Sequence, residues 1–164
     1  MHTLIDRLRH RADSEHEQAI VKAIMGMVWL LYILWAEHYY DVASEAIIAP
    51  VLYLAAIAIF FVWIVVNPAI HPFRRLLGLF LDAYFVSYAL LHLGRPGAPL
   101  IGSYLFITLG HGLRYGNKYL CTSAILNIVG FSIVMTYGEF WKDQKPLGYG
   151  FILAIIVLSG YVAV

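Results

Sequence analysis

Charge is scarce in this sequence, and its absence excludes several classes of protein. Only 13% of the residues are Asp, Glu, Lys or Arg, whereas soluble domains carry about 25%. The net charge is only +1, whereas nucleic-acid-binding proteins typically carry a strongly basic surface. The single cysteine, Cys121, excludes an internal disulfide and a cysteine-based zinc or iron–sulfur site. No Walker, dinucleotide-binding or G-x-S-x-G motif is present, so we predict no catalytic centre within this segment.

Apolar residues dominate instead, in runs long enough to cross a membrane. They make up 62% of the chain, its mean hydropathy is +0.76, and a spanning helix needs about 20 mostly apolar residues. Six segments are candidates, the fourth of them short: 17–37, 46–66, 73–93, 98–113, 120–137 and 148–164. Short connections make neighbouring segments antiparallel. We therefore predict an all-α polytopic membrane protein, an antiparallel bundle of six transmembrane helices in the lipid bilayer.

The two ends of the chain differ in character. Residues 1–16 alternate apolar and basic side chains and predict a cytoplasmic amphipathic segment ahead of a transmembrane domain at 17–164. They are not a signal peptide, because the apolar run that follows is too long and contains Lys22. Ser14 and Glu17 have the spacing of a capping box for the first helix. The last apolar run continues to the final residue, so we expect a cytoplasmic output domain to follow it.

The distribution of Lys and Arg predicts the orientation, because cytoplasmic loops carry the excess of positive charge. With six spans and the N-terminus inside, the inner side holds eight of these residues and the outer side three. The inner set is Arg7, Arg9, Arg11, Lys22, Arg74, Arg75, Arg114 and Lys118, and the outer set is Arg95, Lys142 and Lys145. We therefore predict that both termini are cytoplasmic.

Three polar residues fall inside the predicted spans, where such groups are costly and usually functional. Asp82 is about nine residues into the third segment, Lys22 about five into the first, and Asn127 about seven into the fifth. All three enter from the cytoplasmic side, so we predict that they form one polar layer. Two interpretations stay open: an ion pair that fixes helix packing, or a group that transmits a signal or binds a quinone.

The histidines form pairs within each leaflet of this topology. His38 and His92 fall in the outer leaflet, and His111 falls in the inner leaflet with either His16 or His71. Two imidazoles on facing helices suit the axial positions of a six-coordinate b-type haem, with the porphyrin between the helices. The predicted ligands to the iron of two haems are therefore His38, His92, His16 and His111, with His71 as the substitute for His16. The alternative is that each histidine is merely interfacial.

The surroundings of these histidines agree with a haem site. Glycines flank His111 on both sides, and a residue without a side chain lets a flat macrocycle approach the backbone. Haem propionates bind arginine or tyrosine near the membrane interface, and Arg114, Tyr115 and Arg95 have suitable positions. A zinc site is not predicted, because no cysteine or carboxylate completes a tetrahedral set with the right spacing.

Three stretches together resemble a known family: "RADSEH" at 11–16, "RRLLGLFLD" at 74–82 and "TLGHGLRYGNKYL" at 108–120. They are similar to the membrane input region of RpfC-type sensors, bacterial hybrid histidine kinases that respond to a fatty-acid quorum signal. The resemblance implies a bacterial inner-membrane sensor. It also implies a role in signal perception for a set of residues near the start of the chain: Arg11, Asp13, Ser14, Glu15 and Gln18. That family is usually drawn with this segment outside a five-helix membrane region, whereas the charge count places it inside.

A related membrane region precedes class III adenylate cyclases and is described as a six-helix dihaem-b anchor that responds to the redox state of quinones. His92 and His111 resemble that branch more than the kinases. We therefore predict a dihaem sensor of quinone or quinol that regulates an adenylate cyclase or histidine kinase, as a homodimer through the output domain. The alternatives are a haem-free receptor for a fatty-acid-like signal and an electron-transfer membrane anchor subunit.

Overall fold

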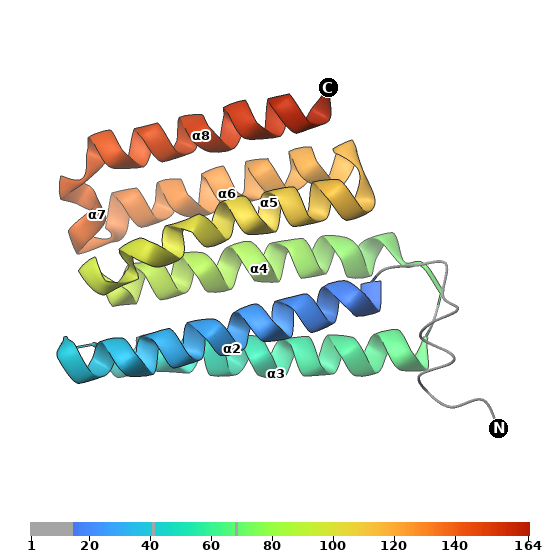
Figure 1. Ribbon diagram of the computed structural model, residues 1–164, viewed down its shortest axis with the longest axis horizontal. Coiled ribbons are helices and arrows are strands. Elements are labelled where there is room, and N and C mark those ends of the chain that lie inside the picture. Colours follow the sequence, from blue (N-terminus) through green and yellow to red (C-terminus); the bar gives the residue numbers. More distant parts are fainter. Residues whose placement is uncertain (1–14, 41, 68) are drawn as a thin grey trace.

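The computed structural model describes residues 15–40, 42–67 and 69–164, and all regular structure in these ranges is helical (Figure 1). The predicted all-α fold is therefore confirmed for the described residues. Nearly all of the predicted amphipathic segment at 1–16, together with Ser14 of the predicted capping box, lies outside them.

Within the described residues, five helices are long and apolar enough to cross a membrane, and each covers one of the predicted segments, apart from Val164 at the end of the last one. They are α2 (Glu15–Tyr39), α3 (Ser44–Val66), α4 (Pro72–Leu93), α6 (Asn117–Tyr137) and α8 (Lys145–Ala163). A short α7 (Glu139–Asp143) joins α6 to α8. Long apolar runs thus predicted these helices correctly. An apolar segment in a membrane must satisfy its backbone hydrogen bonds within itself, and an α-helix does so.

The predicted fourth segment is different. Instead of one helix over 98–113, the chain forms the 3₁₀ helix η1 (Arg95–Ile101) followed by the 14-residue α5 (Gly102–Tyr115). Pro96 and Pro99 lie within η1, and each lacks the N–H that a regular α-helix would use. Five helices of the described residues therefore have spanning length, and the sixth crossing stays a prediction.

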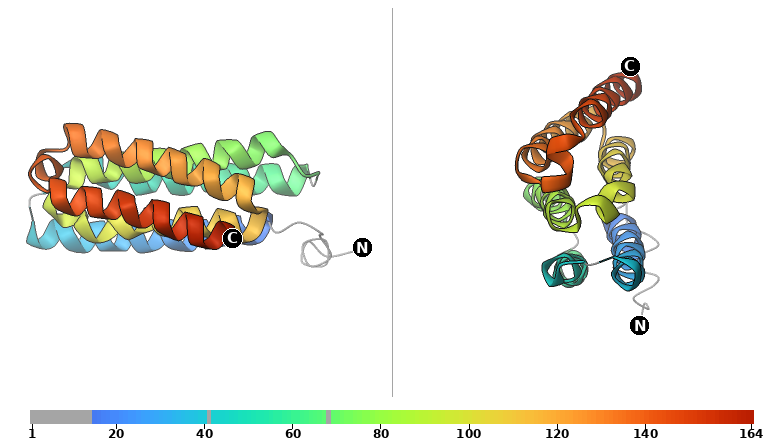
Figure 2. Two further views of the ribbon diagram at one scale, coloured as in Figure 1. Left: turned by 90° about the horizontal axis from the view of Figure 1, so that it is seen from above. Right: turned by 90° about the vertical axis from the view of Figure 1, so that its left-hand side faces the viewer.

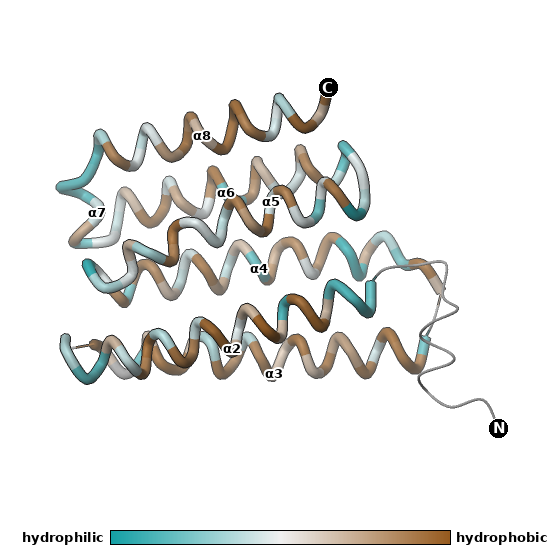
Figure 3. The backbone as a smooth tube through the Cα atoms, viewed as in Figure 1, coloured by the Kyte–Doolittle hydropathy of each residue, from teal (hydrophilic) through white to brown (hydrophobic). Residues whose placement is uncertain are grey.

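The helices pack in two rows. Viewed end-on, α3, α4 and α6 form one row and α2, α5 and α8 form the other (Figure 2). The starts of α2, α4 and α6 lie at the same end of the bundle as the ends of α3, α5 and α8 (Figure 1). We call this the Glu15 end and the opposite one the α7 end. Hydrophilic residues concentrate near the two ends and in the connections (Figure 3).

The interior is filled by large side chains. Tyr104 and Phe131 pack edge to face, with ring centroids 5.6 Å apart, and Trp141 also packs edge to face with Phe131, with centroids 5.3 Å apart. All three are fully buried. Many aliphatic side chains on the outer surface are exposed instead, among them Ile59 and Val62 of α3, as expected for helices that face lipid.

Candidate functional site

A cluster of polar side chains lies within the bundle, with members from four helices. Lys22 of α2 forms an ion pair with Asp82 of α4, Nζ to Oδ2 2.6 Å. Tyr53 of α3 donates a hydrogen bond to Asp82 Oδ1 at 3.0 Å, and Nε2 of His111 of α5 lies 3.5 Å from Asp82 Oδ2. Asp82 is 1% exposed. We call Lys22, Tyr53, Asp82 and His111 the Asp82 cluster.

Asn127, the third residue of the predicted polar layer, forms hydrogen bonds with a different set of residues. Asn127 Nδ2 donates to Thr108 Oγ1 at 2.7 Å and to the Tyr104 carbonyl at 3.0 Å, which ties α6 to α5. Tyr104 in turn shares a hydrogen bond with Ser87 of α4 at 2.7 Å. The polar residues predicted as one layer thus belong to two networks, because the side of α6 that carries Asn127 faces α5 rather than α2.

His111 is held firmly in place. Its Nδ1 lies 2.7 Å from the Ile107 carbonyl, and because a carbonyl only accepts, Nδ1 carries the proton and donates it. A Cβ at Gly112 would come within 2.5 Å of Leu120, so this glycine permits the close contact of α5 with α6. A Cβ at Gly110 would meet nothing within 4 Å. The two glycines beside His111 therefore differ, one in close packing and one beside open space.

That open space is a lateral cavity of about 380 Å³ between α2 and α5. We call it the α2–α5 cleft. The wall from α2 consists of Gln18, Val21, Lys22, Met25 and Trp29, and the wall from α5 consists of Ser103, Phe106, Ile107, Gly110, His111, Leu113 and Arg114. Tyr53 and Asp82 complete its floor. Phe106 and Leu113 of its lining are exposed, so the cleft opens at the outer surface of the bundle, between α2 and α5.

Two contacts tie α2 to the opposite side at the two ends of the cleft. At the Glu15 end, Arg114 Nη1 pairs with Glu17 Oε2 at 3.0 Å. Towards the α7 end, the Tyr32 hydroxyl donates to the Pro96 carbonyl of η1 at 2.6 Å. The cleft is therefore bounded along the bundle axis at both ends.

The Glu15 end carries a buried ionic network that the sequence did not predict. Glu15 is 4% exposed and pairs with both Arg74 and Arg75, the latter through Arg75 Nε at 2.7 Å. Arg74, 2% exposed, also donates to the Asn67 carbonyl at 2.9 Å. The Arg75 guanidinium lies 4.3 Å from the centre of the Tyr115 ring. Arg74 and Arg75 were noted in the sequence because they belong to the stretch that resembles a known family and to the inner set of positive charges. Their partner Glu15 is far away along the chain, so the contact itself was not predicted.

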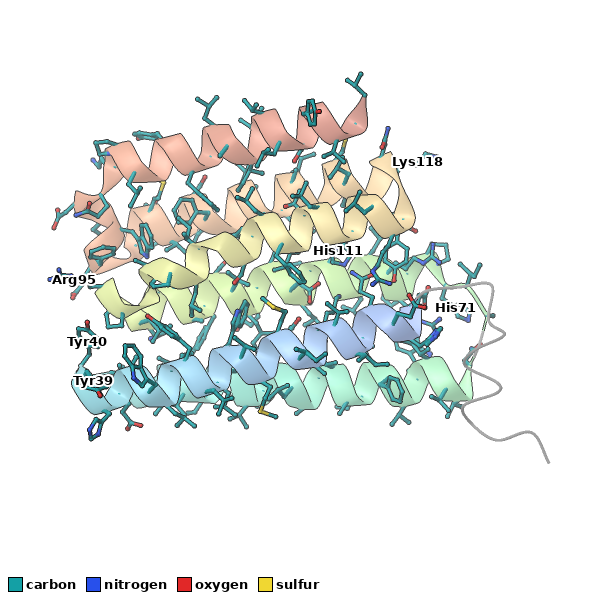
Figure 4. The ribbon with its side chains drawn as sticks, viewed as in Figure 1. Tyr39, Tyr40, His71, Arg95, His111 and Lys118 are labelled. Carbon is teal, nitrogen blue, oxygen red and sulfur yellow. The ribbon has the colours of Figure 1, made fainter. Side chains whose placement is uncertain are left out.

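The histidines predicted as haem ligands lie at different depths. His38 and His92 are exposed near the ends of α2 and α4, and their rings contact Tyr39 and Tyr88 respectively. His16 and His71 are half-buried near the Glu15 end. Figure 4 shows His111 well inside the bundle, His71 at the Glu15 end, and Arg95 at the α7 end.

This arrangement does not fit a bis-histidine haem at His111. Axial ligation requires a free ring nitrogen that faces the iron. Nδ1 donates to a carbonyl, as it does in many metal-bound histidines, so Nε2 would have to bind the iron, and it faces Asp82 Oδ2 at 3.5 Å instead. The predicted propionate partners have other contacts, because Arg114 pairs with Glu17 and Tyr115 lies under Arg75. The two-haem assignment stays a prediction.

Comparison with known proteins gives one relationship. No family model matches the chain, and no solved structure matches it. The chain is 29% identical over 159 residues to the sensory/regulatory protein RpfC from two strains of Xanthomonas campestris pv. campestris. The match covers 94% of this chain and 22% of each relative, so the chain spans about a fifth of their length. The chain is therefore a distant homologue of a sensory protein, and its described residues include five helices long and apolar enough to cross a membrane.

Proposed function

We propose that this chain is the sensory input domain of a bacterial inner-membrane signalling protein, and that it senses a membrane-dissolved amphiphile bound in the α2–α5 cleft. The distant homology to RpfC supports the sensory role, and five apolar helices support the membrane location. We propose further that the Glu15 end is cytoplasmic, and that the whole protein carries a histidine kinase or adenylate cyclase output domain through which it forms a homodimer.

The observation that carries the proposal is the charged floor of a cleft that opens to lipid. Charged groups at this depth of a membrane are costly, and they mark functional sites by default. Asp82 is the eleventh residue of α4, which places it about 15 Å from the start of that helix. The cleft walls nearby are apolar, with Met25 of α2 and Phe106 of α5. An acyl tail suits these walls, and an anionic or hydrogen-bonding head group suits the Asp82 cluster.

Binding would change how α2 is held. A carboxylate head group would compete with Asp82 for the Lys22 ammonium, and the Lys22–Asp82 ion pair is a contact that joins α2 to α4 at this depth. A ligand shifts a conformational equilibrium only through a difference in affinity between the two states. Exchange of the Lys22 partner supplies such a difference, and α2 would then move relative to α4.

A dihaem cytochrome that responds to quinone, and an electron-transfer anchor, are the competing proposals. His111 is buried in the bundle, and a buried imidazole is the kind of ligand that binds haem iron. Its contact with Asp82 favours the amphiphile receptor instead, because a charged floor suits a polar head group.

A cavity-filling variant tests the proposal. Gly110→Leu places a side chain in the cleft, where a Cβ meets no neighbour, and Gly160→Leu is the matched control on α8, where a Cβ also meets nothing within 4 Å. The chain in lipid nanodiscs is titrated with decanoate by calorimetry. We expect Gly110→Leu to weaken binding by about tenfold or more, because a filled cleft excludes the tail, and Gly160→Leu to leave it unchanged. Equal binding by all three proteins would overturn the proposal.

A further inference from the structure

We infer that Trp29 closes the deep end of the α2–α5 cleft and thereby sets the longest tail that the sensor accepts. The inference rests on the proposed function, since it concerns the ligand of the same cleft. It adds a specificity-determining residue that neither the sequence patterns nor the distant relative indicates.

The two walls of the cleft end at the same depth. On α2 the lining residues run from Gln18 to Trp29, and on α5 they run back from Arg114 to Ser103. Each wall covers eleven residue steps, about 16 Å at 1.5 Å per residue. Lys22 of the charged floor is seven steps from Trp29, which leaves about 10 Å for a straight tail.

Trp29 is fixed in position by its neighbours. It is 5% exposed, and its ring stacks on Tyr53 with centroids 5.7 Å apart and planes at 26°. Tyr53 is itself tied to Asp82 by its hydroxyl. Trp29, at the end of the cleft, is therefore held in position by Tyr53, which belongs to the Asp82 cluster that forms the charged floor.

The gap between the helices does not continue beyond Trp29. One turn further along α2, the Tyr32 hydroxyl donates to the Pro96 carbonyl at 2.6 Å and ties α2 to η1. A tail that reaches Trp29 must end there or turn out into the bilayer. Carbon–carbon bonds of about 1.5 Å advance an extended chain by about 1.3 Å per methylene, so about eight methylenes fill the distance from Lys22 to Trp29.

The length limit is measured with saturated fatty acids of increasing length, from octanoate to hexadecanoate, bound to the chain in nanodiscs. Affinity is expressed per mole fraction of fatty acid in the bilayer, so that partition into lipid does not enter. We expect an optimum length for the unchanged chain and a loss of about tenfold for the longest tails, because they cannot all lie in the cleft.

Trp29→Ala should move the optimum to longer tails by about two to four carbons, because truncation of a buried tryptophan opens a cavity. Trp29→Phe should move it less, and this milder variant keeps the test valid if Trp29→Ala does not fold. The matched control is Trp35→Ala on the same helix, since Trp35 is 55% exposed and should not affect the optimum.

The outcomes separate the two proposals. If fatty acids bind and Gly110→Leu abolishes binding, but both Trp29 variants keep the original optimum, the inference about Trp29 is overturned and the proposed function stands. If no fatty acid binds the unchanged chain at any length, the proposed function falls and the inference falls with it.

Discussion

Lys22 of α2 and Asp82 of α4 form an ion pair of 2.6 Å in the floor of the α2–α5 cleft, with side chains 14% and 1% exposed. This pair links the helix that forms one wall of the cleft to the most buried of the spanning helices. A charge at this position can be neutralised by its partner or by a bound head group, and this makes the pair the centre of the proposed sensor.

Replacing Lys22 and Asp82 together should lower the free energy of unfolding by less than the two single substitutions would if their effects added. Lys22→Met or Asp82→Asn leaves one buried partner alone, and we expect each to lower the free energy of unfolding by about 3 kcal/mol. The double variant should lose less than the sum of the two. Unfolding of the four proteins in mixed micelles gives the coupling energy, and strict additivity would contradict a direct interaction.

Two acidic residues of α2, only two positions apart, should respond very differently. Glu15 is 4% exposed and bridges two arginines, so Glu15→Gln should destabilise the fold by about 3 kcal/mol. Glu17 is 59% exposed in its pair with Arg114, and Glu17→Gln should cost about 1 kcal/mol or less. Chemical unfolding of both variants measures the difference, and similar losses would show that the Glu15 network is not a buried anchor.

The glycines on either side of His111 offer a second matched pair. Gly112→Ala places a Cβ 2.5 Å from Leu120, and we expect a loss of about 1–3 kcal/mol from overpacking. Gly110→Ala meets no neighbour and should leave stability unchanged or raise it by up to about 1 kcal/mol. The reverse order of melting temperatures would contradict the packing of α5 on α6.

Visible absorption separates the receptor from the dihaem cytochrome. The chain is expressed with added haem, and its spectrum is recorded oxidised and after reduction with dithionite. The contact between His111 and Asp82 predicts no stoichiometric Soret band and no sharp α and β bands. Two haems per chain that are lost in His92→Ala or His111→Ala would establish the cytochrome instead.

Apolar runs were sufficient to predict the helices, and depth along a helix was sufficient to predict that Lys22 and Asp82 share a layer. Depth alone could not predict the direction of a side chain, and for that reason it did not show that Asn127 bonds to Tyr104 and Thr108 of α5 rather than to Lys22 or Asp82. Hydropathy also could not predict that the fourth segment forms the 3₁₀ helix η1 followed by the shorter helix α5, because it does not register the effect of the prolines in η1.

Partners that are distant along the chain were beyond sequence reasoning. Glu15 meets Arg74 across 59 positions, and nothing in either local sequence specifies that contact. The sequence drew attention to His111, but its neighbour Asp82 depends on how α5 packs against α4. Spacing along one helix cannot distinguish a facing carboxylate from a facing histidine.

The most direct test of the central claim is photo-crosslinking of a fatty acid in the cleft. Decanoate with a diazirine near the tail end is irradiated with the chain in nanodiscs, and the adducts are mapped by mass spectrometry. The account predicts adducts at Met25, Trp29 and Phe106 of the cleft walls, lost in Gly110→Leu and kept in Gly160→Leu. Adducts spread over the lipid-facing surface of α3, at residues such as Ile59 and Val62, with none in the cleft, would contradict it.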